Sequence, residues 1–270
     1  MADPSLIDAP ELEGRAAFAE RLAQAAGEAI LPHFRERIRV DDKGAAGAFD
    51  PVTEADRAAE RAMRALIEER YPQDGITGEE FPAKPSRNGL RWVLDPIDGT
   101  RAFIAGLPSW GVLIALNDGT RPVLGAIHQP YLRELFVGIN GAGLRRASLN
   151  GAAIACRPCP RLADAVLSTT GLDFLPDGDR TAFLRLADEV RMVRYGFDCY
   201  AYAVLALGFV DLVAESMLQP YDVQALIPLI EAAGGKITSW EGGDAQHGGR
   251  ILAAGDPRLH AAATGVLHGV

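Results

Sequence analysis

Two aspartates stand directly after a short apolar segment that reads as a β-strand. The strand is predicted over residues 91–94, and the residues that follow read Asp-Pro-Ile-Asp-Gly-Thr. Pro96 ends the pairing of the strand, and Gly99 allows a turn that other residues resist. Asp95 and Asp98 are therefore placed at the carboxyl end of a strand, where open α/β sheets tend to have their ligand sites. Taken alone, the same hexapeptide also fits an ordinary Asp/Pro/Gly turn.

Further carboxylates stand where other predicted elements begin or end. Glu79 lies in a Gly-Glu-Glu loop, Asp50 precedes the start of a predicted helix, and Asp222 stands just ahead of another. A single carboxylate at a helix start is explained by the helix dipole and the free amides, which stabilise it by about 0.3–1 kcal/mol. As a set, Glu79, Asp222 and the two strand-end aspartates are hard oxygen ligands that would repel one another without cations between them. The set favours a magnesium site.

The acidic residues need secondary-structure elements that bring them together. Apolar residues that recur at intervals of three and four predict a helix over residues 11–37, and a capping-box pattern predicts a second over 53–71. A loop is expected at 41–47, and Pro228 is expected to kink its helix or to interrupt one hydrogen bond. The other expected elements are strands at 91–94, 110–117, 123–128, 134–139, 210–214 and 236–240, helices at 179–189, 200–207 and 223–233, and a final strand and helix from 251.

The order of these elements predicts a layered α/β architecture with helices packed against sheets. A boundary is expected near residues 140–150, in a glycine-containing turn. Residues 1–145 would form an N-terminal half with two helices and an antiparallel sheet that carries most of the metal ligands. Residues 146–270 would form a C-terminal α/β half that completes the metal and substrate site.

Composition excludes several classes of protein. The chain has 270 residues, 48% of them hydrophobic, with 27 Lys and Arg against 36 Asp and Glu, for a net charge of -9. An acidic chain of this kind argues against nucleic acid as a partner. No apolar stretch approaches the length that a membrane span requires, which is about 20 residues. No secretory signal is visible at the first residues, so a cytoplasmic location is expected.

Other hydrolytic chemistries lack their sequence patterns. The 3 cysteines do not form a disulfide framework, and the 5 histidines show no metal-ligand spacing, which disfavours zinc. No Gly-x-Ser-x-Gly motif surrounds a serine, and Cys199 has no histidine partner that its spacing identifies. Covalent catalysis is therefore not supported.

Four motifs in one order resemble those of the inositol monophosphatase superfamily. They are DPVTEAD at residues 50–56, GEE at 78–80, WVLDPIDGT at 92–100 and PYDVQALIPLIEAAGG at 220–235, and the resemblance covers about residues 11–265. It implies an αβαβα sandwich and a Mg-dependent, lithium-sensitive phosphomonoesterase. Residues 194–202 and 219–228 are more similar to the histidinol-phosphate phosphatase branch than to the inositol branch.

The resemblance also implies a role for individual residues. Glu79, Asp95 and the Ile97 carbonyl would hold a first Mg²⁺, and Asp95, Asp98 and Asp222 a second, with a third, looser ion near Glu79. Two such ions would stabilise the entering and the leaving oxygen of an in-line displacement. Asp50 and Thr100 would act with Glu79 to orient and deprotonate the attacking water.

The remaining substrate contacts are implied in the same way. Backbone amides of Gly99 and Thr100 would receive phosphate oxygens at a helix start. Arg194, Asp198 and Glu215 would line the rest of the substrate pocket beside Glu79, Ile97, Asp98 and Asp222. Acidic side chains there suit an imidazole and an ammonium group, whereas Arg194 could reach the phosphate. Each of these three residues also fits a surface ion pair.

The leading hypothesis is a histidinol-phosphate phosphatase of histidine biosynthesis that works as a homodimer, the state typical of the family. Alternative substrates are inositol 1-phosphate, fructose 1,6-bisphosphate and 3′-phosphoadenosine 5′-phosphate. A protein of another class, one that binds Mg²⁺ without catalysis, is also compatible with the fold. The acidic residues and Thr100 speak against it, because all the residue types that the chemistry needs are present.

Overall fold

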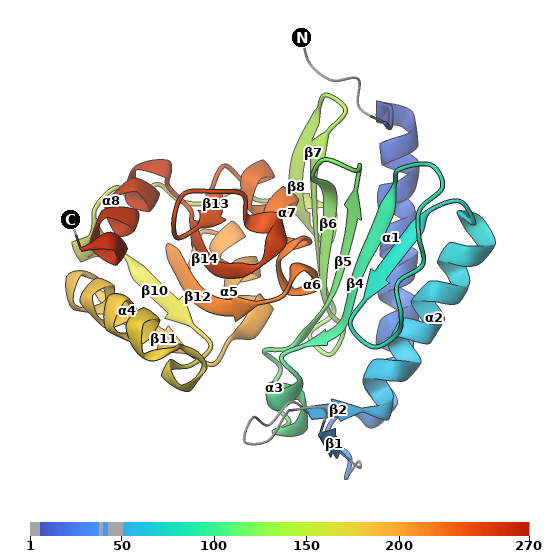
Figure 1. Ribbon diagram of the computed structural model, residues 1–270, viewed down its shortest axis with the longest axis horizontal. Coiled ribbons are helices and arrows are strands. Elements are labelled where there is room, and N and C mark those ends of the chain that lie inside the picture. The colour runs from blue at the N-terminus through green and yellow to red at the C-terminus, as the bar shows by residue number, and fades with distance from the viewer. Residues whose placement is uncertain (1–5, 38–39, 43–50, 270) are drawn as a thin grey trace.

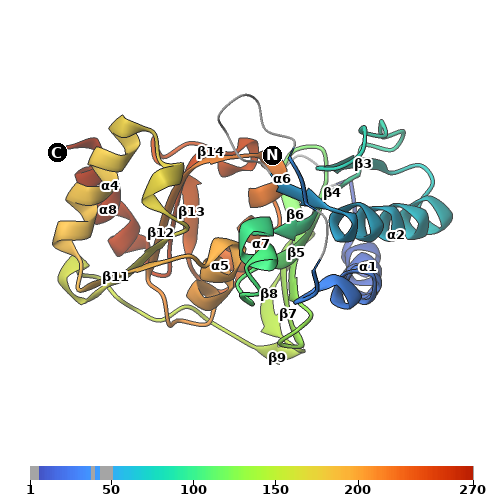
Figure 2. The same ribbon diagram turned by 90° about the horizontal axis from the view of Figure 1, so that it is seen from below.

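The computed structural model describes residues 6–37, 40–42 and 51–269. In this part of the chain, helices and sheets alternate in five layers, which confirms the αβαβα sandwich (Figure 1). Figure 2 shows the helices of the outer and central layers from another side. The outer helices are α1 (Ala9–Ile30) and α2 (Glu54–Arg70) on one side and α4 (Asp177–Glu189) and α8 (Pro257–His268) on the other, with α5 (Asp198–Ala206) and α7 (Leu226–Ala232) between the sheets.

The first two helices begin at side-chain caps. The Asp8 side chain accepts a hydrogen bond from the Glu11 amide at 2.8 Å, and Thr53 forms the expected capping box at the start of α2. The helix expected to reach residue 37 ends earlier, at Ile30, and Leu31–His33 form a 3₁₀ turn. Pro32 lies in that turn, and a proline has no N–H to continue the α-helical pattern.

A seven-stranded sheet packs against α1 and α2. Its strand order follows the chain from β3 to β9, with β3 and β4 parallel and all other neighbours antiparallel, so the expected meander is confirmed and extended. The strands are β3 (Gly75–Gly78), β4 (Arg91–Asp98), β5 (Gly111–Asn117), β6 (Pro122–Gln129), β7 (Glu134–Gly141), β8 (Leu144–Leu149) and β9 (Ala152–Ala153).

The structure corrects the expectation that Pro96 ends β4. The strand continues to Asp98, and Asp95 pairs with Leu113 whereas Asp98 pairs with Gly111. The two residues between the aspartates therefore oppose a single residue of β5, which is a β-bulge. Bulges redirect side chains, and this one lies between the two candidate ligands.

The segment expected as a loop at 41–47 is described only in part. Asp41 and Asp42 belong to a short strand, β1 (Val40–Asp42), which pairs with β2 (Pro51–Thr53), so for these two residues the loop prediction is wrong. The other expected loop residues, and Asp50, lie outside the described residues.

The second sheet has five strands in the order β11, β10, β12, β14, β13. The sequence did not predict β10 and β11, which are short. The strand expected at 210–214 starts at Leu212 and runs on to Leu218, which places Glu215 within it. The strands are β10 (Val166–Thr169), β11 (Met192–Tyr195), β12 (Leu212–Leu218), β13 (Lys236–Ser239) and β14 (Gly249–Ala254).

The helix expected at 223–233 is divided in two. A short helix, α6 (Pro220–Val223), precedes α7, and Pro228 lies in the first turn of α7, where no intrahelical partner needs its missing N–H. α7 packs closely on the seven-stranded sheet: a Cβ on Gly138 would lie 2.2 Å from the Leu229 Cα. The C-terminal half therefore shares a core with the first sheet.

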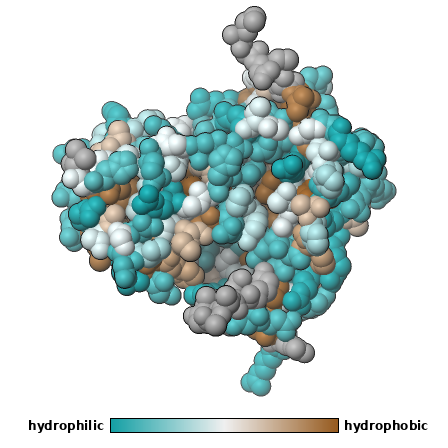
Figure 3. Space-filling view, in the orientation of Figure 1, coloured by the Kyte–Doolittle hydropathy of each residue, from teal (hydrophilic) through white to brown (hydrophobic). Residues whose placement is uncertain are grey.

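The expected boundary near residues 140–150 falls in the turn between β7 and β8. The seven-stranded sheet continues past it to Ala153. We therefore propose that the division between the halves follows β9. In the described residues no helix is both long and apolar enough to cross a membrane, and hydrophilic side chains cover most of the face seen in Figure 3.

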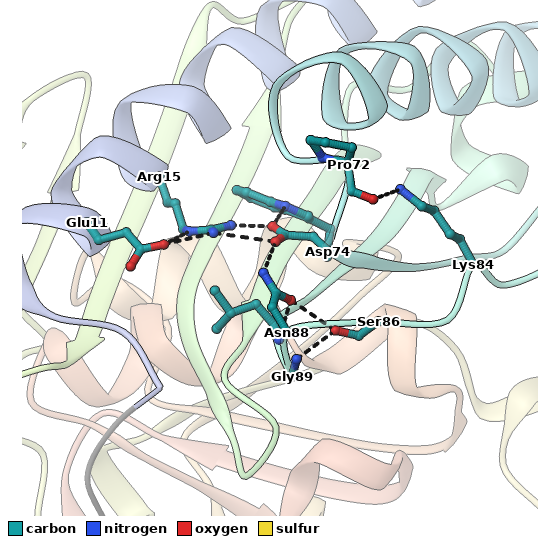
Figure 4. Close-up of polar contacts among 10 residues, drawn as sticks. Glu11, Arg15, Pro72, Asp74, Lys84, Ser86, Asn88 and Gly89 are labelled. Atoms are coloured by element: carbon teal, nitrogen blue, oxygen red, sulfur yellow. Dashed lines mark hydrogen bonds and ion pairs between the residues drawn. The ribbon is translucent and has the colours of Figure 1, made fainter.

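A buried ion pair joins α1 to the turn that precedes β3 (Figure 4). The Arg15 guanidinium pairs with Asp74, and both side chains are almost fully buried, at 3% and 1% exposed. Asp74 also accepts hydrogen bonds from the Trp92 indole at 2.9 Å and from the Asn88 amide at 2.7 Å. Because each polar group has a partner, the pair can be buried.

Candidate metal centre and substrate pocket

Three of the predicted metal ligands converge. One carboxylate oxygen each from Asp95, Asp98 and Asp222 lies within 4.8 Å of the other two. The first two come from the bulged end of β4, and the third comes from α6, which follows the end of β12. Residues far apart in the sequence therefore form one cluster of oxygen atoms, as the motif order predicts.

Asp222 has two roles at the start of α6. Its carboxylate accepts a hydrogen bond from the Gln219 amide at 2.7 Å and so caps the helix. The same side chain is part of the acidic cluster. The structural explanation for an acid at a helix start therefore holds and is compatible with the predicted ligand role, because a carboxylate has more lone pairs than one amide uses.

The cluster is electrostatically unfavourable without a cation. Asp95 is 1% exposed, and burial, together with the charges of Glu79, Asp98 and Asp222, holds its pKa well above the usual range. Burial, and then the charge of Asp98, raise the pKa of Asp222 in the same way. Carboxyl groups in this state bind protons unless a cation replaces them. The donors are all hard oxygen atoms, so the residues present fit a divalent cation such as Mg²⁺.

Glu79 lies next to this cluster. β3 pairs in parallel with β4, with Gly78 opposite Leu94, so the next residue of each segment, Glu79 and Asp95, is brought to the same side of the sheet. Glu79 lines the same cavity, and its charge and a hydrogen bond raise the pKa of Asp95. The position of Glu79 therefore agrees with the predicted ligand role.

The turn after β4 has the conformation that its glycine allows. Gly99 adopts φ = 87° and precedes α3 (Thr100–Ile104), and a Cβ there would lie 2.9 Å from the Asp198 carboxyl carbon. The Thr100 hydroxyl donates to the Ile97 carbonyl at 3.1 Å. That carbonyl keeps a second lone pair for a cation. The predicted pairing of Thr100 with Asp50 cannot be followed, because Asp50 lies outside the described residues.

A cavity of about 380 Å³ extends from the acidic cluster into the C-terminal half. It is lined by Glu79, Asp95, Asp98 and Asp222 and also by Asp198 and Glu215. A second cavity, of about 530 Å³, has Arg91 and His247 as its ionisable lining residues. Among the cavities found in the described part of the chain, the first is therefore the one suited to a cation and a phosphate ester.

Asp198 is held in an unusual position at the start of α5. It has φ = 45°, a conformation that few residues other than glycine, asparagine and aspartate adopt. Burial, reinforced by the charges of Asp98 and Glu215, raises the pKa of Asp198 to about 8, and the charge of Arg101 acts in the opposite direction. The amide of the next residue, Cys199, donates to the Asp98 carboxylate at 2.6 Å. The start of α5 therefore contacts the metal-ligand cluster directly.

Both oxygens of the Glu215 carboxylate accept hydrogen bonds from other residues of the protein. One oxygen accepts hydrogen bonds from the amide and the hydroxyl of Thr170, at 2.9 and 2.5 Å, and the other accepts from the Tyr202 hydroxyl at 2.9 Å. The side chain is buried, which raises its pKa. Glu215 therefore shapes the cavity and adds to its negative potential.

Arg194 is the predicted site residue that the described structure does not bring into the cavity. It lies on β11, is exposed, and its guanidinium is 5.8 Å from the centre of the Phe197 ring. Sequence reasoning instead missed two residues at the cavity mouth, Arg101 and Phe174, whose guanidinium and ring lie 4.3 Å apart. Arg101 directly follows the DPIDGT motif, which is a signal that could have pointed to it.

A cluster of one buried and two half-buried carboxylates in an αβαβα sandwich fits a metal-dependent hydrolase of phosphate esters. Residues 11–270 match the inositol monophosphatase family, and the chain belongs to it. It is a phosphomonoesterase of that family.

Three related proteins illustrate the similarity. The chain is 47% identical, over 88% of its length and 68% of the relative, to the chloroplastic bifunctional phosphatase IMPL2 of Arabidopsis thaliana. It is 37% identical to a histidinol-phosphatase of Chlorobaculum parvum, over 82% of this chain and 84% of that one. The solved structure of an inositol monophosphatase from Zymomonas mobilis has a TM-score of 0.85 and 42% identity, over 95% of this chain and 98% of that one.

Proposed function

We propose that this protein is a histidinol-phosphate phosphatase, which hydrolyses L-histidinol phosphate to L-histidinol and phosphate. The observation that carries the proposal is the half-buried carboxyl group of Asp198, which lines the same cavity as the predicted metal ligands and whose pKa burial raises to about 8. The similarity to a relative named histidinol-phosphatase supports the same assignment.

The phosphate end of the cavity serves any phosphomonoester. Two or three Mg²⁺ ions, held by Glu79, Asp95, the Ile97 carbonyl, Asp98 and Asp222, would neutralise the developing charge and activate water. The free amides at the start of α3 would orient the phosphate oxygens. Thr100, Asp50 and Glu79 are proposed to orient the attacking water and to accept its proton.

The part of the cavity that Asp198 and Glu215 line would select the alcohol that leaves the phosphate. Histidinol carries an ammonium group and an imidazole, both of which are suited to a carboxylate. The oxygens of Glu215 already accept hydrogen bonds from Thr170 and Tyr202, so we assign the ammonium group to Asp198. Binding of a cationic group would stabilise the ionised form of Asp198 against the effect of burial.

Substitution of Asp198 tests this assignment. Asn tolerates positive φ as well as Asp, so Asp198→Asn removes the charge and keeps the backbone conformation. We expect KM for histidinol phosphate to rise about 10- to 100-fold, with a smaller effect on inositol 1-phosphate, because one charged hydrogen bond contributes about 1.5–3 kcal/mol. The measurement is phosphate release at saturating Mg²⁺.

The matched control is Asp188→Asn, which changes an exposed aspartate of α4 outside the cavity lining and should leave both KM values unchanged. An equal rise in KM for both substrates would contradict the proposal that Asp198 recognises the ammonium group. A panel of phosphomonoesters, repeated with lithium, tests the wider assignment. Turnover of inositol 1-phosphate without turnover of histidinol phosphate would remove the assignment to histidinol phosphate and leave the phosphomonoesterase activity in place.

A second candidate is an inositol monophosphatase, which the 42% identity to the Zymomonas mobilis protein favours. The neutral hydroxyl groups of inositol do not need a half-buried carboxyl such as Asp198, which is why we rank this candidate second. A homodimer is also proposed, and sedimentation velocity would measure it.

A further inference from the structure

Two side chains of α2, Glu60 and Arg64, form hydrogen bonds with the backbone of the loop that carries Glu79. Glu60 is 0% exposed, and one of its oxygens accepts a hydrogen bond from the Glu80 amide at 2.8 Å. Its other oxygen accepts from Arg64 Nε at 2.7 Å, one helical turn further along α2. Arg64 also donates to the carbonyl of Phe81 at 3.0 Å. Both backbone contacts fall directly after Glu79.

The residue before Glu79 is shaped for the same contact. A Cβ on Gly78 would lie 2.0 Å from Glu60 Oε1 and 2.4 Å from its carboxyl carbon. The absence of a side chain at Gly78 therefore lets the Glu60 carboxylate reach the loop. The backbone on both sides of Glu79 is thus in contact with Glu60.

We propose that Glu60, oriented by Arg64, is a positioning residue that holds the backbone of residues 78–81 and thereby places the Glu79 carboxylate at the cation site. Stability alone is a weak explanation for the ion pair, because a buried pair often contributes little compared with apolar residues of similar size. Groups that orient metal ligands commonly change metal affinity by about 10- to 100-fold when they are removed.

This role depends on Glu79 as a ligand and is independent of which phosphomonoester is the substrate. In Glu60→Met the carboxylate is replaced by an apolar chain of similar length, so the Glu80 amide and Arg64 lose their acceptor. In Glu60→Gln an acceptor for the amide is kept and the negative charge is lost. Comparison of the two variants separates the effect of losing the loop contact from the effect of losing the negative charge.

The experiment is calorimetric titration of Mg²⁺ into the whole protein, which does not depend on activity. We expect Glu60→Met to raise the dissociation constant about 10- to 100-fold and Glu60→Gln to raise it less. The control for general destabilisation is His260→Gln, which alters a buried side chain on α8 that contacts Thr238 at 2.9 Å. It should leave Mg²⁺ affinity unchanged.

A double-mutant cycle with Glu79→Gln decides whether Glu60 acts through Glu79. If it does, Glu60→Met has no further effect on Mg²⁺ affinity once Glu79 is changed. Additive effects, or an unchanged affinity in Glu60→Met itself, would overturn the proposal. Failure of the wild-type protein to bind Mg²⁺ would remove the metal-dependent function as well, which is a different result from an unaffected Glu60→Met variant.

Discussion

At the scale of single residues, Asp95 is the acidic residue on which the proposed metal site depends most. Its side chain is the most enclosed of the acidic cluster, and it is coupled by charge to Glu79, Asp98 and Asp222. It is also the residue that both predicted cation sites share. No other side chain contributes to both, so its charge should be the hardest to replace.

We expect Asp95→Asn to lose hydrolysis by more than about a hundredfold, because a direct ligand should cost more than an orienting group, for which about 10- to 100-fold is usual. The fold should be retained, since the substitution is isosteric and removes repulsion within the cluster. Phosphate release measures activity, and circular dichroism measures the fold. A folded variant with unchanged activity would exclude a bridging role for Asp95.

At the scale of elements, the site is assembled from strand ends and short helices. The bulge in β4 separates Asp95 from Asp98, α6 carries Asp222 to them, and α5 contacts Asp98 through the Cys199 amide. These elements stay in place because outer helices brace the sheets. On the N-terminal side, the Arg15–Asp74 pair fastens α1 to the turn before β3.

Asp74→Asn should lower the free energy of unfolding by up to about 3–5 kcal/mol, because it leaves the buried Arg15 guanidinium with only the exposed Glu11 carboxylate, 2.9 Å away, as its counter-ion. Urea denaturation measures the loss. The double variant Arg15→Met with Asp74→Asn should be less destabilised than Asp74→Asn, since no buried charge remains and the side-chain oxygen at position 74 can still accept from the Trp92 indole. If the double variant were the less stable of the two, the buried charge would not be the cause.

At the scale of the whole molecule, metal binding and folding are linked through pH. Asp95 and Asp222 have raised pKa values, and that of Asp198 is raised to about 8. In the folded, metal-free protein these groups keep protons that the unfolded chain releases near pH 4. Their contribution to stability is therefore present at low pH and is lost as pH rises through the folded-state pKa values.

Stabilisation by Mg²⁺ should accordingly grow between about pH 5 and pH 8, because the cation binds the ionised carboxylates. At a hundredfold excess over the dissociation constant it should reach about 2.7 kcal/mol. The measurement is the difference in unfolding free energy between Mg²⁺ and a chelator at each pH. His260, whose pKa burial lowers to about 4, contributes equally in both buffers and cancels. A difference that shrinks as pH rises would contradict the linkage.

The sequence alone determined the family, the candidate residues for a metal site and the first long helices. Helix periodicity, the Thr53 capping box and motif order are local properties, and these predictions agree with the structure. The end of α1 at Ile30 was missed although Pro32 was visible, because the apolar pattern continues past it.

Only the tertiary structure decided how the site is shaped. The β4 bulge depends on pairing with β5, the position of Asp198 depends on its approach to Gly99, and the displacement of Arg194 depends on where β11 joins the sheet. The hydrogen bond from the Glu80 amide to the Glu60 carboxylate joins segments that are distant along the chain. Contacts of this kind arise from packing between elements, and no local sequence pattern encodes them.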